Sequence, residues 1–188
     1  MVQTPEITLT LAEFLELPET KPAISEYIDG TVIPKPMPQG KHSLLQRELS
    51  FFLMTSFRSQ KTAQAFPELR CTFGERSLVP DIAIFRDSRI PRDDDGQVAN
   101  RFDLAPDWAI EILSPNQSQT KVIRNLLHCL DYGTEMGWLL DINEPCLFIY
   151  DRDKSIQAMT NLDLILPVPT FASSIELTLK EILDWLKA

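Results

Sequence analysis

Two acidic side chains lie inside strongly apolar segments, where a charged group is least expected. Asp81 stands in Val-Pro-Asp-Ile-Ala-Ile-Phe, and Glu111 stands 30 residues later in Trp-Ala-Ile-Glu-Ile-Leu. A buried carboxylate costs free energy unless it is paired, hydrogen-bonded or bound to a metal. If the two acids converge at one edge of a sheet, they suit Mg²⁺, which prefers oxygen ligands. The alternative is structural: Asp81 caps a strand after Pro80, and Glu111 pairs with an arginine.

The elements that must position these acids alternate between strands and helices. A hairpin is expected over 25–40, because Asp29-Gly30 is a turn signal between two short strands. Helical periodicity or capping residues indicate helices over 8–16, 42–57, 114–133 and 178–188. Apolar segments indicate strands over 68–75, 78–85, 107–113, 136–142, 146–151 and 162–169, and residues 86–106 form a long polar loop.

This order predicts an α/β (α+β) fold in one domain over residues 1–188. We expect a central mixed β-sheet flanked by helices, with an N-terminal β-hairpin. The core covers about 25–151, and a C-terminal strand and helix cover 162–188.

Composition limits the possible partners. The chain has 18 Lys and Arg against 27 Asp and Glu, a net charge of −9. Such a chain repels polyanions, so a nucleic-acid role needs a local basic patch, a bound metal or a partner. There is no apolar run of membrane-spanning length and no signal peptide, so we expect a cytoplasmic protein without a membrane role. The three cysteines contain no CxxC pair and are expected to be buried thiols.

A longer ordered series of motifs carries a family resemblance. The series is Glu26-Tyr-Ile-Asp29-Gly30, His42 at a helix start, Pro80-Asp81, Glu111-Ile-Leu-Ser114-Pro115, Tyr132-Gly133 and Trp138-Leu-Leu-Asp141. It resembles the Uma-two family of candidate restriction endonucleases, a domain of unknown function in the PD-(D/E)XK nuclease superfamily. The resemblance runs from about residue 8 to 185, and it implies a restriction-endonuclease-like fold.

The resemblance also implies a metal site. Asp81, Glu111 and the backbone carbonyl of Ile112 would be the ligands, and Glu48 on the preceding helix would complete the site. Glu48 would otherwise be a solvated helix acid paired with a neighbouring base. Glu26 is a second candidate acid, which would otherwise hold the hairpin together.

The chain departs from the superfamily pattern at the catalytic lysine. The E-x-K motif would place lysine at 113, where this chain has Leu113. In relatives with a displaced lysine the charge comes from the following helix, where Lys121 is the first lysine. Helical projection puts Lys121 nearly opposite the packed face, and Gln119 or Gln117 could instead supply a polar group there.

Further residues could contact the phosphate backbone. His42 resembles the family's helix-opening histidine and would contact phosphate or shuttle a proton, unless the backbone satisfies it. A basic rim is expected from five residues, which are Lys35, Lys41, Arg86, Arg89 and Arg92. His128 is expected on the surface, and Ser114 is expected to be a cap.

These inferences favour a Mg²⁺-dependent endonuclease acting on DNA, with Mn²⁺ as a substitute ion. Water would attack phosphorus in line, while the ion neutralises the added charge. A homodimer is expected, because restriction-type nucleases often cut two strands with two sites. The alternative is a catalytically inactive nuclease-fold module for protein or nucleic-acid association. A third possibility is a nuclease acting on RNA or on a branched intermediate.

Overall fold

The computed structural model describes residues 9–17, 24–115 and 117–187. Its helices are α1 (Leu11–Leu15), α2 (Gly40–Gln60), α3 (Gln119–Asp131) and α4 (Leu179–Asp184), with 3-10 turns at Asp87–Arg89, Thr170–Ala172 and Trp185–Lys187. Its strands are β1 (Ser25–Ile28), β2 (Thr31–Pro34), β3 (Ala63–Pro67), β4 (Cys71–Phe73), β5 (Arg76–Leu78), β6 (Ile82–Arg86), β7 (Trp108–Leu113), β8 (Met136–Asp141), β9 (Cys146–Asp151) and β10 (Ile156–Met159).

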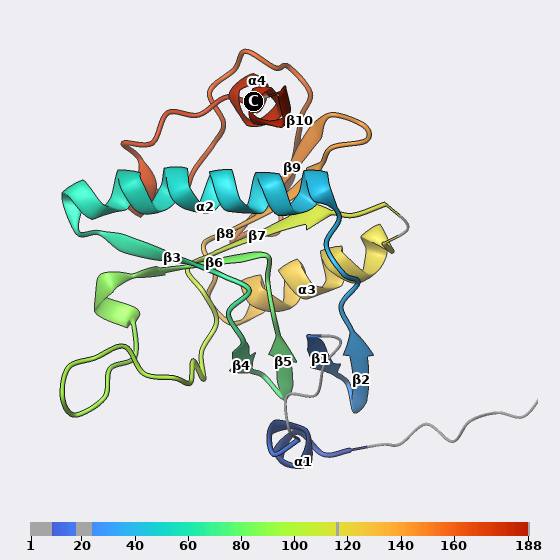
Figure 1. The fold of residues 1–188 in the computed structure, drawn as a ribbon, viewed down its shortest axis with the longest axis vertical. Coiled ribbons are helices and arrows are strands. Elements are labelled where there is room, and N and C mark those ends of the chain that lie inside the picture. The colour runs from blue at the N-terminus through green and yellow to red at the C-terminus, as the bar shows by residue number, and fades with distance from the viewer. Residues whose placement is uncertain (1–8, 18–23, 116, 188) are drawn as a thin grey trace, which may run out of the picture.

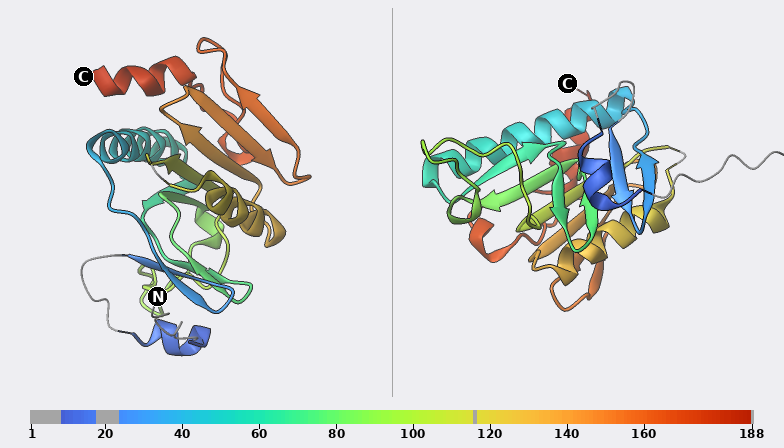
Figure 2. Two further views of the ribbon diagram at one scale, coloured as in Figure 1. Left: turned by 90° about the vertical axis from the view of Figure 1, so that its right-hand side faces the viewer. Right: turned by 90° about the horizontal axis from the view of Figure 1, so that it is seen from below.

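The expected α/β fold with a central mixed sheet is confirmed, and the N-terminal hairpin belongs to a second, smaller sheet. A six-stranded mixed sheet has the order β10-β9-β8-β7-β6-β3, and only its β7–β8 pair is parallel. A four-stranded antiparallel sheet has the order β2-β1-β5-β4. Helix α2 covers one face of the large sheet, while α3 and the small sheet lie on the other side (Figure 1). Helices α1 and α4 lie at opposite ends of the molecule (Figure 2).

The large sheet is apolar on both faces because helices cover both of them. Ile82 and Ile110 belong to the hydrophobic cluster that includes the α2 side chains Leu45, Leu49 and Leu53. The alternate positions Ala83 and Ala109 belong to a second cluster, which includes Val122 and Leu126 of α3. Glu111 has the same strand parity as Ala109, so it faces the α3 side within an otherwise apolar layer.

The segment 78–85 was expected to be one strand, and this prediction is wrong. It divides at Val79-Pro80-Asp81, so that β5 ends in the small sheet and β6 begins in the large one. Proline has no N–H to donate to a ladder, which favours a break in pairing at this position. Asp81 therefore lies at the junction between the two sheets, immediately before β6.

Three further expectations need correction. Strand β3 was not predicted, although it forms the edge of the large sheet beside β6. Residues 162–169 are not a strand; they make only an isolated bridge between Ile165 and Thr178, and β10 forms the other edge of the sheet. The C-terminal helix is shorter than 178–188, since α4 ends at Asp184 and continues as a 3-10 turn.

Most other elements lie where they were expected, but the strand over 68–75 is shortened to β4, and the helix over 114–133 begins only at Gln119. The hairpin turns at Asp29-Gly30, where both residues have positive φ, and α2 and α3 lie where helices were expected. None of the helices in the described ranges combines the length and apolarity needed to cross a bilayer.

Candidate active site

The carboxylates of Asp81 and Glu111 come together at the start of β6. Strands β6 and β7 pair antiparallel with Ile82 opposite Ile110, so the next positions along the same register are Asp81 and Glu111. Residues directly opposite on an antiparallel pair project from the same face of the sheet. The two side chains are almost fully buried, with exposed fractions of 3% for Asp81 and 4% for Glu111.

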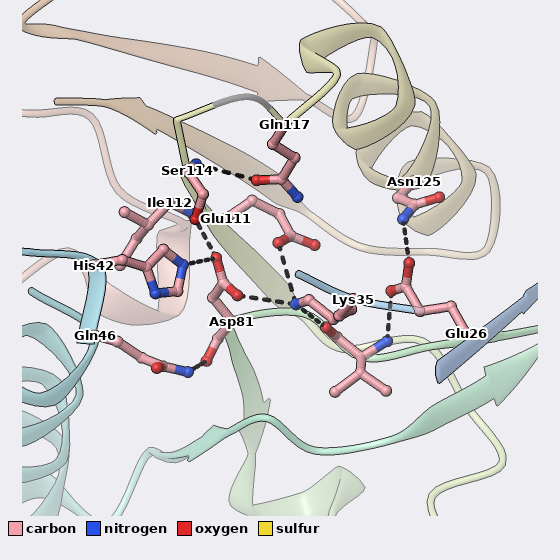
Figure 3. A network of polar contacts seen from close by, with 11 residues as sticks. Glu26, Lys35, His42, Gln46, Asp81, Glu111, Ile112, Ser114, Gln117 and Asn125 are labelled. Atoms are coloured by element: carbon pink, nitrogen blue, oxygen red, sulfur yellow. Dashed lines mark hydrogen bonds and ion pairs between the residues drawn. The ribbon is translucent and has the colours of Figure 1, made fainter. Parts of the chain in front are cut away.

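Asp81 is held on both carboxylate oxygens (Figure 3). Its Oδ1 lies 2.9 Å from Lys35 Nζ, while its Oδ2 lies 3.0 Å from His42 Nε2 and accepts the Ile112 N–H at 2.7 Å. Gln46, one turn after His42 on α2, donates to the Asp81 main-chain oxygen at 2.9 Å. Helix α2, strand β7 and the segment after β2 therefore converge to fix this one side chain.

Lys35 is the cation of the site. It follows directly on β2, and its Nζ donates to the Val79 carbonyl at 2.6 Å as well as to Asp81. The same Nζ lies 3.8 Å from Glu111 Oε2. Sequence analysis placed Lys35 on an outer basic rim; the structure places it between the two carboxylates. The only signal for this position was a lysine between Pro34 and Pro36 directly after the hairpin.

Burial and the lysine act in opposite directions on these groups. Burial alone would raise the pKa of Asp81, but Lys35 and His42 outweigh it and lower that pKa to about 2. Burial raises the pKa of Glu111 well above its usual range, although Lys35 opposes the shift. For Lys35, the nearby Glu111 and Asp81 outweigh burial, so its pKa is raised. Burial therefore favours the protonated form of Glu111, whereas Lys35 and His42 favour the ionised form of Asp81.

Glu26 reaches the same region from the small sheet. Its Oε1 accepts the Val79 N–H at 2.9 Å, and its Oε2 accepts from Asn125 Nδ2 of α3 at 3.2 Å. Val79 therefore connects the two residues: its N–H donates to Glu26, and its carbonyl accepts from Lys35. Burial raises the pKa of Glu26, although Lys35 opposes that shift.

Glu48 does not join the other predicted residues. It accepts from Arg47 on the partly exposed side of α2, and among the described residues no polar contact connects it to Asp81 or Glu111. Gln46 takes the place on α2 that sequence analysis gave to Glu48. Because α2 turns 100° per residue, Gln46 and Glu48 project from very different sides of the helix.

Among the described residues, the two predicted on α3, Lys121 and Gln119, make no polar contact with Asp81 or Glu111. Lys121 and Gln119 are exposed in the first turns of the helix. Lys121 lines a cavity that Glu26 and Lys35 also line. Gln117, just before the helix, accepts the Ser114 N–H at 3.1 Å and lines a small cleft over Asp81.

Comparison with known proteins identifies the family. The model of the Uma2 family, described as "Putative restriction endonuclease", matches residues 11–180. The chain belongs to the Uma2 family. No curated protein matched it. A solved structure, titled as a putative nuclease belonging to DUF820 from Anabaena variabilis ATCC 29413, is 54% identical, with a TM-score of 0.92; the match covers 95% of this chain and 99% of that one.

The donor set of this Uma2 protein fits a hard cation. Asp81 and Glu111 supply carboxylate oxygens, and the Ile112 carbonyl faces the same end of β6, since the N–H and C=O of one strand residue point to the same side. A cleft of about 30 Å³ over Asp81, also lined by Lys35 and His42, has room for a water or an ion. Among the described residues, no three His, Cys, Asp or Glu side chains form a metal cage. Mg²⁺ does not need one, because it binds through one or two carboxylates and keeps several waters.

Two basic residues of the expected rim have a structural role in this Uma2 protein. Asp107 is fully buried, and it accepts from Arg86 Nε at 2.7 Å and from Arg89 Nη1 at 2.8 Å. His128 was expected on the surface and is instead buried, with Nε2 3.2 Å from the Phe73 carbonyl and its ring stacked on Phe73. These three side chains are therefore engaged within the protein.

Proposed function

We propose that this Uma2 protein is a metal-dependent DNA endonuclease that hydrolyses phosphodiester bonds. The observation that carries the proposal is the buried, directly opposed pair of Asp81 and Glu111 with Lys35 Nζ between them. Asp81 is compensated by Lys35 and His42, whereas burial leaves Glu111 with a raised pKa, and perturbed carboxylates in a cleft are typical of functional sites. Family membership supports a nuclease-like role, and the similar Anabaena protein is described as a putative nuclease.

Each residue has a defined task in this proposal. Asp81, Glu111 and the Ile112 carbonyl would hold Mg²⁺ or Mn²⁺. When bound, the ion would activate a water molecule and neutralise charge that develops on the phosphate. Lys35 supplies the positive charge that E-x-K nucleases carry two residues after the glutamate, and its Nζ can stabilise the transition-state oxygens. His42 and Gln46 act as positioning residues, because they hold the side chain and backbone of Asp81.

The overall charge supports a role for the ion and for a second subunit. A net charge of −9 opposes binding of bare DNA, whereas a bound cation reverses the local field at the carboxylates. Cutting both strands of a duplex is most direct with two sites, so we expect a homodimer. Light scattering should then give about twice 21.5 kDa, and a clean monomer would contradict this part of the proposal.

The proposed reaction is tested by nicking of supercoiled plasmid in Mg²⁺ or Mn²⁺. Wild type should convert plasmid to nicked or linear DNA, and EDTA should stop the reaction. Asp81→Asn and Glu111→Gln should be inactive, while Glu48→Gln, which removes an acid outside the site, should retain activity. If folded wild type nicks nothing, the protein is instead a non-catalytic nuclease-fold module. If Glu111→Gln remains fully active, the carboxylate pair is not the reaction centre.

A further inference from the structure

A second, larger cavity lies beside the carboxylate pair. It has a volume of about 320 Å³ and lies between strand β2 and helix α3. Lys35 and Gln117 line both this cavity and the small cleft over Asp81. Figure 3 shows Lys35 lying between the Asp81–Glu111 pair and Glu26, which lines the larger cavity. A ligand in the cavity would therefore be next to the proposed reaction centre.

The lining has the chemistry of a pocket for a flat, partly polar ring. Ile28, Ile33 and Val122 form apolar walls together with two prolines, while Asn125 and Gln117 present amide groups. Asn125 uses its Nδ2 on Glu26, and among the described residues no hydrogen bond reaches its Oδ1. Apolar walls with a few polar groups, in a volume of about 300 Å³ or more, are typical of small-ligand sites.

Two cations lie where this pocket meets solvent. Lys121 and Arg124 are exposed on α3, and both line the cavity. Together with Lys35 at the inner end, they give the lining three cations against one acid, Glu26, in a chain whose net charge is −9. A ligand with an uncharged ring and an anionic group on either side would match this distribution.

We infer that the cavity takes one unpaired base of the DNA strand, so that its neighbouring phosphate lies at Lys35 and the carboxylate pair. This inference rests on the proposed function and narrows its substrate to DNA with an unpaired nucleotide. A base within a duplex is stacked and paired, and it reaches such a pocket only by leaving the stack, at a cost of a few kcal/mol. In a single-stranded, bulged or damaged site the base is already unpaired, so less free energy is needed to move it into the cavity.

The small number of Lys and Arg side chains near the cavity also favours a substrate with a short, unpaired contact region. A protein that holds a long duplex by its backbone needs many Lys and Arg contacts. Here Arg86 and Arg89 are engaged by Asp107. Among the described residues, the cations that line the cavity are Lys35, which is paired with Asp81, Arg124, which lies 3.5 Å from Asp29, and Lys121. A short contact around one nucleotide is what this charge distribution can provide.

The test uses three matched DNA duplexes with the wild-type protein in EDTA, and again with Glu111→Gln in Mg²⁺. One duplex is perfectly paired, one has a single unpaired 2-aminopurine, and one has an abasic residue at that position. We expect the bulged 2-aminopurine duplex to bind at least tenfold more tightly than the other two. Its fluorescence should rise on binding, because 2-aminopurine is quenched by stacking and no aromatic side chain lines the cavity.

Protein variants separate the cavity from general charge. Lys121→Ala with Arg124→Ala should weaken binding of the bulged duplex. The loss of two phosphate contacts should lower the magnitude of the slope of log K against log salt concentration by about 1.8. The matched control, Arg101→Ala with Lys180→Ala, removes two exposed charges that do not line the cavity and should leave both unchanged. Equal affinity for all three duplexes, no binding, or unchanged 2-aminopurine fluorescence would overturn the inference.

The two proposals fail in different ways. Plasmid nicking that depends on Asp81 and Glu111, with no response of the 2-aminopurine probe, would retain the nuclease and reject the base pocket. A fluorescent response without any cleavage would retain the pocket and reject the catalytic proposal.

Discussion

Lys35 Nζ lies 2.9 Å from Asp81 Oδ1, although the two residues are 46 positions apart in sequence. The lysine that an E-x-K motif carries on the strand of the glutamate is absent here, because position 113 is leucine. The Leu113 side chain instead packs in the apolar cluster on the α3 side. In the proposed site the positive charge would come instead from Lys35, which directly follows β2 of the small sheet.

Replacing Lys35 tests this relationship. Lys35→Met keeps most of the apolar stem but removes the charge, and we expect plasmid nicking to fall by about 100-fold or more, as on loss of a transition-state donor. Lys121→Ala should reduce nicking far less, since Lys121 makes no contact with the carboxylates. Initial nicking rates at saturating Mg²⁺ compare the two variants. A larger loss for Lys121→Ala than for Lys35→Met would indicate that Lys121 of α3, and not Lys35, is the catalytic lysine.

Asp81 should stabilise the fold above acidic pH. Its pKa falls to about 2 from 3.8, so its contribution is present above pH 4 and is lost as pH falls toward 2. This shift corresponds to about 2 kcal/mol. Asp81→Asn should therefore lower the free energy of unfolding by about this amount in urea at pH 7. The deficit should shrink below pH 4, and a deficit independent of pH would indicate another cause.

Glu111 should have the opposite effect on stability. Burial raises its pKa, so the contribution of Glu111 to the free energy of unfolding is largest below pH 4.5. That contribution declines as pH rises toward the raised pKa. Glu111→Gln resembles the protonated acid and cannot ionise. In EDTA the variant should melt at a higher temperature than wild type at pH 8, and at nearly the same temperature at pH 4.5. Equal melting temperatures at pH 8 would contradict the raised pKa.

Part of the candidate site could be predicted from the sequence, because an acidic residue inside an apolar segment is unusual. Asp81 and Glu111 are detectable as acids in apolar strands, and Glu26 and His42 follow from motif order. Lys35 and Asn125 could not be found in this way, since each contacts an acid many residues away and lies in an unremarkable local pattern. The break at Pro80 was missed because 78–85 is apolar throughout, although its two halves belong to different sheets.

The surface arginines illustrate the same limit. Arg86 and Arg89 have the sequence appearance of a phosphate-binding rim, but Asp107 is fully buried and binds both. Asp107→Ala removes the charged acceptor of two partly exposed arginines and should lower the free energy of unfolding by about 1.5–3 kcal/mol. Urea unfolding measures this loss. A change of less than 1 kcal/mol would show that the arginines are free to bind other groups.

The most direct test of the account is whether Asp81 and Glu111 bind one divalent cation. Calorimetric titration of Mn²⁺ compares wild type, Glu111→Gln and Glu48→Gln, with folding checked by circular dichroism. We predict one site in wild type and in Glu48→Gln, accompanied by proton release as Glu111 ionises, and no site in Glu111→Gln. Equal binding by all three folded proteins, without proton release, would show that the carboxylate pair is not the metal centre.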